Sequence, residues 1–325
     1  MAVSALLIAT SIRVQAALAK SRFQGTYVPA QEIIILRRNS LMSIDRRALL
    51  AGAGSLALTS LLQGAELEWP SWRGPKRDAL STEKGLLKSW PESGPKMDWR
   101  VEGLGAAYSS LAISHGQIFT MGIIGEDECL ISLDLKDGKQ KWKTPLGTNG
   151  EPNCTPTIDG ELVYALGREG TLICADRDSG KIVWKVDFKK DFGGKMMSGW
   201  GYSESPLVDG ELLIVTPGGK DAMLAALNKK TGKPVWGTKV PDNLNGGAAY
   251  SSVVISNAGG VKQYVQLVGK GIIGVHAKTG IGLWNYERIA NGTANIPTPI
   301  VSGDYVFCST GYGTGSALLL SLIHI

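Results

Sequence analysis

The sequence predicts an all-β fold, a β-propeller of four-stranded antiparallel blades, on three observations. A turn-and-strand unit recurs four times and ends each time on tryptophan: DLKDGKQKW (134–142), DRDSGKIVW (176–184), NKKTGKPVW (228–236) and HAKTGIGLW (276–284). Counted from Trp99, the tryptophans follow one another at steps of 43, 42, 52 and 48 residues, a period typical of propeller blades. A pair of short alternating stretches precedes each unit, as antiparallel strands require.

The front half of each unit predicts two short strands. The segments are SSLAISHGQIFTMG (109–122), TPTIDGELVYALG (155–167), SPLVDGELLIVTPG (205–218), SSVVISNAGGVKQYVQLVG (251–269) and TPIVSGDYVFCSTG (298–311). The pairs Asp159-Gly160 and Asp209-Gly210 are strong two-residue hairpin signals. Each blade is therefore expected to run strand, tight turn, strand, short loop, strand, glycine turn, strand.

The back half predicts the glycine turn and an outer strand. A glycine stands four residues before each tryptophan, where a hairpin needs a positive φ. A polar residue four positions earlier is expected to bond the free N–H groups of the turn; these residues are Asp134, Asp176, Asn228 and His276. The tryptophan is expected to cover the face of the neighbouring blade. Pro234 on this strand fits only an edge strand.

The unit LD-x-x-x-G-K-x-x-W, preceded by SP-x-V-x-DG, resembles the pyrroloquinoline-quinone-like β-propeller repeat over about 99–320. The opening WPSWRGP (69–75) resembles the entry segment of bacterial secreted members. The family includes quinoprotein dehydrogenases and non-enzymatic scaffolds such as those of the BamB type, which serve the outer-membrane barrel assembly machinery. The resemblance implies the fold, whereas one fold hosts unrelated activities.

The chain divides into four expected segments. Residues 1–41 are interpreted as a non-native upstream extension with Met42 as the true start, and 42–65 as a Tat-like signal peptide, because Arg46-Arg47 precedes the apolar run 48–62. The alternative is a disordered basic tail followed by an ordinary helix. The run is shorter than the ~20 residues of a membrane span. Residues 66–98 form the entry segment and 99–325 the propeller. We therefore expect a periplasmic or secreted protein without a transmembrane span when mature.

The propeller is expected to be truncated to about five blades of seven or eight. Trp99 is interpreted as a lone strand that closes the last blade. The unit that begins at Thr298 reaches neither its glycine turn nor its tryptophan and runs into an apolar tail, SALLLSLIHI, without a turn signal.

Charge and cysteine usage exclude some classes of protein. The net charge of +5 lies within 1–65, which leaves the repeat region neutral, so a nucleic-acid partner is not expected. The four cysteines have no CxxC spacing and the three histidines are scattered, so no metal site is predicted. Cys129, Cys174 and Cys308 fall in strand patterns and are expected to be buried.

Candidate binding residues lie in loops that are expected to gather around the channel. The segment 185–205 offers Trp200 and Tyr202 as flat surfaces and Glu204 as a carboxylate near the channel mouth, and Arg168 and Asn245 come from neighbouring loops. The alternatives are that the aromatic residues plug the channel end, that Arg168 is a solvated turn charge and that Asn245 forms a turn. No catalytic residue is predicted.

These observations favour a monomeric, non-enzymatic scaffold that binds envelope proteins and needs no cofactor. The alternatives are a quinoprotein dehydrogenase acting on alcohols or sugars, with pyrroloquinoline quinone and calcium, and a glycan- or small-molecule-binding propeller. The sequence lacks the vicinal Cys-Cys pair typical of the dehydrogenases and any calcium-ligand spacing. A calcium site would need distant residues such as Glu204, Asp221 and Asn245 to converge.

Overall fold

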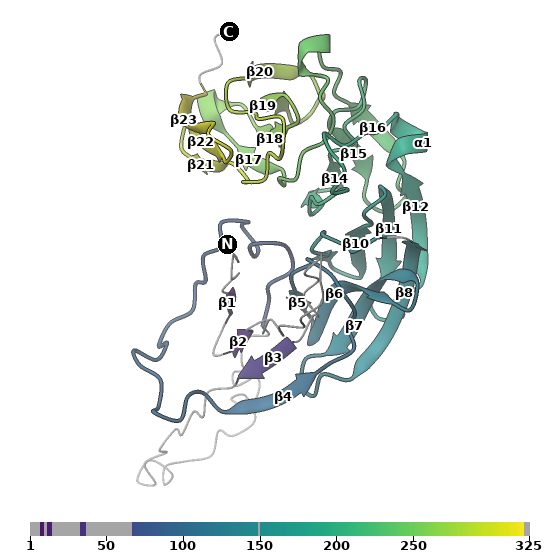
Figure 1. Cartoon of the computed structure of the whole chain (residues 1–325), viewed down its shortest axis with the longest axis vertical. Coiled ribbons are helices and arrows are strands. Elements are labelled where there is room, and N and C mark those ends of the chain that lie inside the picture. The colour runs from purple at the N-terminus through teal and green to yellow at the C-terminus, as the bar shows by residue number, and fades with distance from the viewer. Residues whose placement is uncertain (1–6, 10–11, 15–32, 37–66, 149, 322–325) are drawn as a thin grey trace, which may run out of the picture.

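The computed structural model describes residues 7–9, 12–14, 33–36, 67–148 and 150–321. Within them lie five successive antiparallel sheets, the blades, and a further sheet at the N-terminal side. The sheets follow one another along an arc in chain order, with the last strand of each four-stranded blade on the outside (Figure 1). The predicted all-β propeller architecture of four-stranded antiparallel blades is confirmed.

Strands within a blade pair in sequence order. Blade 1 holds β5 (Ala112–Ser114), β6 (Gln117–Ile124), β7 (Asp127–Asp134) and β8 (Gln140–Thr148). Blade 2 holds β9 (Thr157–Asp159), β10 (Leu162–Leu166), β11 (Thr171–Asp176) and β12 (Ile182–Asp187). Blade 3 holds β13 (Leu207–Asp209), β14 (Leu212–Val215), β15 (Ala225–Asn228) and β16 (Pro234–Gly237). Blade 4 holds β17 (Val254–Ser256), β18 (Gln263–Val268), β19 (Gly271–His276) and β20 (Gly282–Tyr286), and blade 5 holds β21 (Ile300–Ser302), β22 (Tyr305–Thr310) and β23 (Gly315–Leu320).

The glycine turns form as predicted. In blade 2, Gly180 has a φ of +71°, and the carboxylate of Asp176 accepts hydrogen bonds from the Ser179 N–H at 2.8 Å and from the Ser179 hydroxyl at 2.6 Å. These bonds to the charged form lower the pKa of Asp176. In blade 4 the ring Nδ1 of His276 accepts from the Lys278 N–H in the same place.

Neighbouring blades meet on their outer side through the repeated tryptophan. The indole N–H groups of Trp99, Trp142 and Trp184 donate to the turn carbonyls of Leu135, Arg177 and Lys229 in the next blade, at 3.3, 3.0 and 3.0 Å. Trp284 differs, because its N–H donates at 2.6 Å to Gln263 of its own blade and its ring lies over Gly274. The described part of blade 5 ends at residue 321, after its third strand, and includes no such glycine turn against Trp284.

On their inner side the blades are joined by a chain of hydroxyl groups. At equivalent positions just before the first strand, a backbone N–H of one blade donates to the Ser or Thr hydroxyl of the next. The donors and acceptors are Ser110 to Thr155, Thr155 to Ser205, Ser205 to Ser252 and Ser252 to Thr298, at 3.2, 3.1, 2.9 and 3.0 Å. Each N–H therefore finds its partner in another blade, as buried donors must.

The core lies between blades and is apolar. The middle strands are buried on both faces, as in β10 and β11, because they lie between two blades. Cys129, Cys154, Cys174 and Cys308 are free and buried, which confirms the expectation for the three strand cysteines.

Across the described ranges, helical structure is confined to short connections. Helix α1 (Phe188–Phe192) follows blade 2, where the Asp187 carboxylate caps it by accepting from the N–H groups of Lys189 and Lys190. Two 3₁₀ turns span Asp242–Leu244 and Ala258–Gly260. None of the helices in the described residues has the length and apolar character needed to cross a bilayer.

The two ends of the repeat region differ from expectation. Trp99 does not stand on a lone strand, because β4 (Met97–Val101) pairs with β3 (Ile33–Leu36) in a sheet with β1 (Leu7–Ala9) and β2 (Ile12–Val14). The apolar tail that begins at Ser316 is not an unpaired extension as far as Leu320, because 311–314 turn the chain and β23 pairs with β22. The assignments of 1–41 and 42–65, and the truncation, stay predictions; most of 1–41 and all of 42–65, with Arg46 and Arg47, lie outside the described residues.

The entry segment contributes residues 69–79, here called the strap, which run along the inner strands. Trp69 exchanges backbone hydrogen bonds with Ile113 of β5, and the Ile158 N–H of β9 donates to the Pro70 carbonyl at 2.7 Å. Further along, Arg77 reaches blade 3. Three non-glycine residues of the strap have positive φ: Arg73 at 64°, Arg77 at 56° and Ala79 at 61°. Such strained backbone persists only where surrounding contacts hold it.

Candidate functional site

Three of the five predicted residues lie close together on the face formed by the connecting loops. The Arg168 guanidinium donates to the Gly199 carbonyl at 3.2 Å, and the Arg168 carbonyl accepts from the Tyr202 N–H at 2.9 Å. The aliphatic stem of Arg168 packs against Gly201, where a Cβ would lie 2.3 Å away. Arg168 is thus half-buried and braces the segment that carries Trp200.

Trp200 and Tyr202 have different surroundings although they are two residues apart. The Trp200 side chain is 65% exposed, and its carbonyl accepts from the Asn153 amide at 3.1 Å. Tyr202 is buried; its hydroxyl donates to the Pro217 carbonyl at 2.9 Å and its ring meets Phe188 edge-on at 5.3 Å. Trp200 therefore presents a flat, exposed ring at the surface, whereas Tyr202 supports the loop from below.

Glu204 lies inside the molecule rather than at an open channel mouth. Its Oε1 accepts from the Thr216 N–H, while its Oε2 is buried without a hydrogen-bond partner among the described residues. Burial raises the pKa of Glu204 to about 7, against the opposing effects of the Thr216 hydrogen bonds and the positive charge of Arg77. The carboxyl group therefore titrates near neutral pH.

Arg77 of the strap is the charge that faces Glu204, and the sequence analysis did not select it. Its guanidinium donates to the Ser205 and Pro206 carbonyls at 2.7 and 2.9 Å, and its Nε has no partner among the described residues. Burial lowers the pKa of Arg77 to about 10, partly offset by Glu204. An arginine that follows prolines and glycines in a loop is usually exposed to solvent. Only the three-dimensional contacts of Arg77 show that it is buried.

Glu128 of β7 is a second buried carboxyl group missed by the sequence analysis. Its Oε1 accepts from the Arg168 N–H at 2.8 Å, and burial raises its pKa to about 7. Its position near the start of a strand, one residue before buried Cys129, was the available signal. It joins blade 1 to the loop that braces Trp200.

Asn245 and the remaining charges do not assemble into a metal site. The Asn245 Oδ1 is buried and unpaired among the described residues, and Asn245 makes no hydrogen bond there with the other four candidates. Asp221 is exposed and lies 3.8 Å from the Lys239 ammonium. Within 67–148 and 150–321, no three His, Cys, Asp or Glu side chains gather as metal ligands. These residues therefore do not fit the calcium site that a quinoprotein would require.

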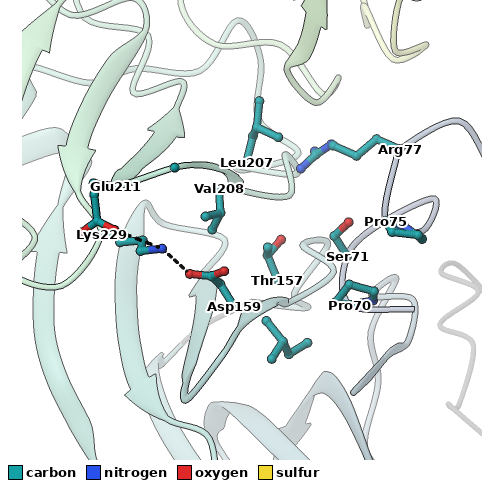
Figure 2. Close-up of a pocket in the computed structure, with 12 residues that line it drawn as sticks. Pro70, Ser71, Pro75, Arg77, Thr157, Asp159, Leu207, Val208, Glu211 and Lys229 are labelled. Atoms are coloured by element: carbon teal, nitrogen blue, oxygen red, sulfur yellow. Dashed lines mark hydrogen bonds and ion pairs between the residues drawn. The ribbon is translucent and has the colours of Figure 1, made fainter. Parts of the chain in front are cut away.

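A pocket of about 380 Å³ lies between the strap and blades 2 and 3. Figure 2 shows Pro70, Ser71 and Pro75 of the strap on one side, facing Asp159 and Lys229. The Lys229 ammonium is 2.6 Å from the Asp159 carboxylate and 3.8 Å from that of Glu211, and its side chain is only 14% exposed. The pocket is thus polar at one end and walled by Ile158, Leu207 and Val208.

Comparison with known proteins supports the architecture. A family model described as outer membrane protein assembly factor BamB matches residues 126–321. BamB of Escherichia coli (strain K12) is 32% identical over 107 residues, which cover 30% of this chain and 26% of that protein. The chain thus matches about a quarter of the length of this curated relative.

The chain is also similar to solved structures. BamB from Moraxella catarrhalis superposes with a TM-score of 0.50 and 17% identity over 67% of this chain and 62% of that chain. A europium-containing methanol dehydrogenase gives a TM-score of 0.47 at 15% identity, over 60% of this chain and 46% of that chain. Since the family model covers more than half of the sequence, the chain belongs to the BamB family of pyrroloquinoline-quinone-like β-propellers.

Proposed function

We propose that this protein is an exported, non-enzymatic propeller that acts as a monomeric protein-interaction scaffold in the cell envelope. The observation that carries the proposal is the family match over 126–321, because the family is described as an outer-membrane assembly factor. The neutral charge of the repeat region also suits a protein that binds other proteins rather than nucleic acid.

The use of the buried charged groups supports a scaffold. Arg77 holds two carbonyls of blade 3, Glu204 accepts from Thr216, and Glu128 accepts from Arg168. Arg77 and Glu128 join segments that are distant in sequence, whereas Glu204 joins the start and the middle of blade 3. Their structural contacts account for their positions without a reacting substrate.

The surface that we propose for partner binding centres on Trp200. An exposed tryptophan on a braced loop provides a large rigid contact area, and such residues are enriched among binding hot spots. The brace consists of Arg168 on Gly199 and Asn153 on the Trp200 carbonyl. Two residues before Trp200, the Ser198 hydroxyl is hydrogen-bonded to that of Tyr250, which lies in the connection between β16 and β17.

The test is recovery of barrel-assembly components from envelope membranes with the tagged full chain. We expect the wild-type protein to recover them and Trp200→Ala to lower recovery about tenfold or more, since a hot-spot residue contributes about 2 kcal/mol or more. Trp90→Ala is the matched control, because Trp90 is 43% exposed and lies in the entry segment. Failure of the wild-type protein to recover any component contradicts the scaffold; full recovery by Trp200→Ala contradicts only the choice of surface.

Export is tested separately. We propose that residues 42–65 direct Tat-type export to the periplasm, so a double change of Arg46→Lys and Arg47→Lys should retain the protein in the cytoplasm. Cell fractionation with an immunoblot measures this. Unchanged export of the double variant contradicts the proposed signal.

The quinoprotein alternative has its own assay. Pyrroloquinoline quinone with Ca²⁺ should leave the purified protein without alcohol- or sugar-dependent dye reduction. Substrate-dependent turnover would instead establish a dehydrogenase.

A further inference from the structure

We propose that the pocket between the strap and blades 2 and 3 binds a neutral sugar ring. This inference goes beyond the scaffold proposal and does not depend on it, because the pocket lies among the first-hairpin turns of the blades, apart from the loop of Trp200. Its volume of about 380 Å³ falls within the range of small-molecule sites, about 300–1,000 Å³.

The charges of the pocket select against charged ligands. Lys229 and Arg77 bring two positive charges, and Asp159 and Glu211 bring two negative ones. An anion at the polar end would meet the two carboxylates, and a cation would meet the Lys229 ammonium. A polyhydroxylated neutral molecule avoids both conflicts, since each hydroxyl donates to a carboxylate and accepts from an ammonium.

The polar groups have capacity left for such a ligand. The Lys229 ammonium has three N–H donors and makes one short contact, with Asp159. The hydroxyls of Ser71 and Thr157 donate to the Gly74 and Pro206 carbonyls and keep their acceptor lone pairs. Hydroxyl groups of a sugar satisfy donors and acceptors of this kind together.

The apolar walls fit the C–H face of a sugar ring. Ile158, Leu207 and Val208 line the pocket from blades 2 and 3, and Pro70 and Pro75 line it from the strap (Figure 2). The strap is held in place by Arg77 and by the backbone bonds to Ile113 and Ile158, and Arg77, one of its residues with positive φ, lines the pocket. Strain of this kind clusters at ligand sites, and a preformed pocket binds at a lower ordering cost.

The test uses D-glucose and cellobiose as neutral probes, with D-glucuronate and D-glucosamine as charged analogues. Saturation-transfer difference NMR and a titration of the full chain should show binding of the neutral probes and at least about tenfold weaker binding of both charged ones. Tighter binding of cellobiose than of glucose indicates a polysaccharide source, and equal binding indicates a free sugar. Absence of a signal from both neutral probes overturns the proposal.

Two variants and one control locate the site. Lys229→Met should weaken glucose binding about tenfold or more, whereas Lys230→Met, whose ammonium lies 3.3 Å from Glu211 but does not line the pocket, should stay within about twofold. Asp159→Asn removes one negative charge and should therefore strengthen the binding of D-glucuronate relative to that of D-glucose. That change of preference is not expected from a structural role alone. Unaltered binding by both variants, with folding verified by circular dichroism, overturns the proposal.

Discussion

The indole ring of Trp142 packs so closely on Gly180 of the next blade that a Cβ at Gly180 would lie 2.5 Å from it. The same contact joins Trp99 to Gly138, Trp184 to Gly232 and Trp236 to Gly280. Glycine at these turns therefore serves two purposes, since it takes the positive φ and leaves room for the ring.

Gly180→Ala separates these two purposes from each other when it is compared with Gly160→Ala. Gly160 also has a positive φ, 58°, but nothing lies within 4 Å of its Cβ position. We expect Gly160→Ala to cost about 1 kcal/mol of unfolding free energy from backbone strain. Gly180→Ala should cost about 1–3 kcal/mol more, as overpacking does. Urea denaturation measures both, and equal costs would show that the ring contact contributes nothing.

Ser205→Ala tests the hydroxyl chain between blades. The variant leaves the Thr155 N–H without its acceptor, so we expect a loss of about 1–3 kcal/mol in unfolding free energy. Ser203→Ala is the control, because the Ser203 hydroxyl donates only locally, to the Gly201 carbonyl at 3.2 Å. A loss as large for Ser203→Ala would contradict a special role of the inner chain.

Glu204 should make stability depend on pH. The unfolded carboxyl ionises near its usual 4.5, whereas the folded one has a pKa of about 7. Between these values the folded state binds the extra proton, so stability is complete at low pH and falls as pH rises from about 5 to about 8. The shift corresponds to about 3 kcal/mol.

Glu204→Gln should therefore flatten the decline in unfolding free energy between pH 5 and pH 8. Exposed Glu161→Gln serves as the control and should leave the profile unchanged. Glu128 contributes a decline in the same direction, because its folded pKa is also about 7. A Glu204→Gln profile as steep as that of the wild-type protein would refute this assignment.

Arg77→Met should release the strap. The change leaves the Ser205 and Pro206 carbonyls unpaired, and hydrogen bonds to charged groups contribute about 1.5–3 kcal/mol each. We expect trypsin to cut after Arg73 and Lys76 about tenfold faster or more, because each 1.4 kcal/mol changes an opening equilibrium about tenfold. Arg100→Met, which removes an exposed partner of Glu102, should leave these rates unaltered. Unchanged cleavage in Arg77→Met would mean that other contacts hold the strap.

The blades were predictable because their signals are local. The turn at Gly180, the polar residue at 176 and the tryptophan at 184 lie within nine positions, and the hairpin at Asp159-Gly160 is two residues long. Each signal reports a backbone geometry that neighbouring residues decide. The partner of each tryptophan followed from the order of the blades.

The buried charges were not predictable for the opposite reason. Arg77 bonds carbonyls 128 and 129 positions away, and nothing near it in sequence indicates burial. Glu204 was selected as a carboxylate near the channel mouth, because it lies in a connecting loop, yet Arg77 of the strap lies against it and it is buried. The β1–β4 sheet was missed because residues 7–36 carry none of the turn signals of the repeat.

The two contacts at each blade junction also bear on how such a chain changes over generations. Outside, a ring lies on a glycine; inside, a hydroxyl accepts from an amide, and both contacts repeat from blade 1 to blade 4 with few exceptions. Duplication or deletion of one whole unit in the gene would place two blades side by side that carry the same matching groups. The tryptophan and the backbone N–H of one blade would again meet a glycine turn and a hydroxyl of the next. The number of blades can therefore change by recombination between repeats, because the new neighbours meet through the same two contacts.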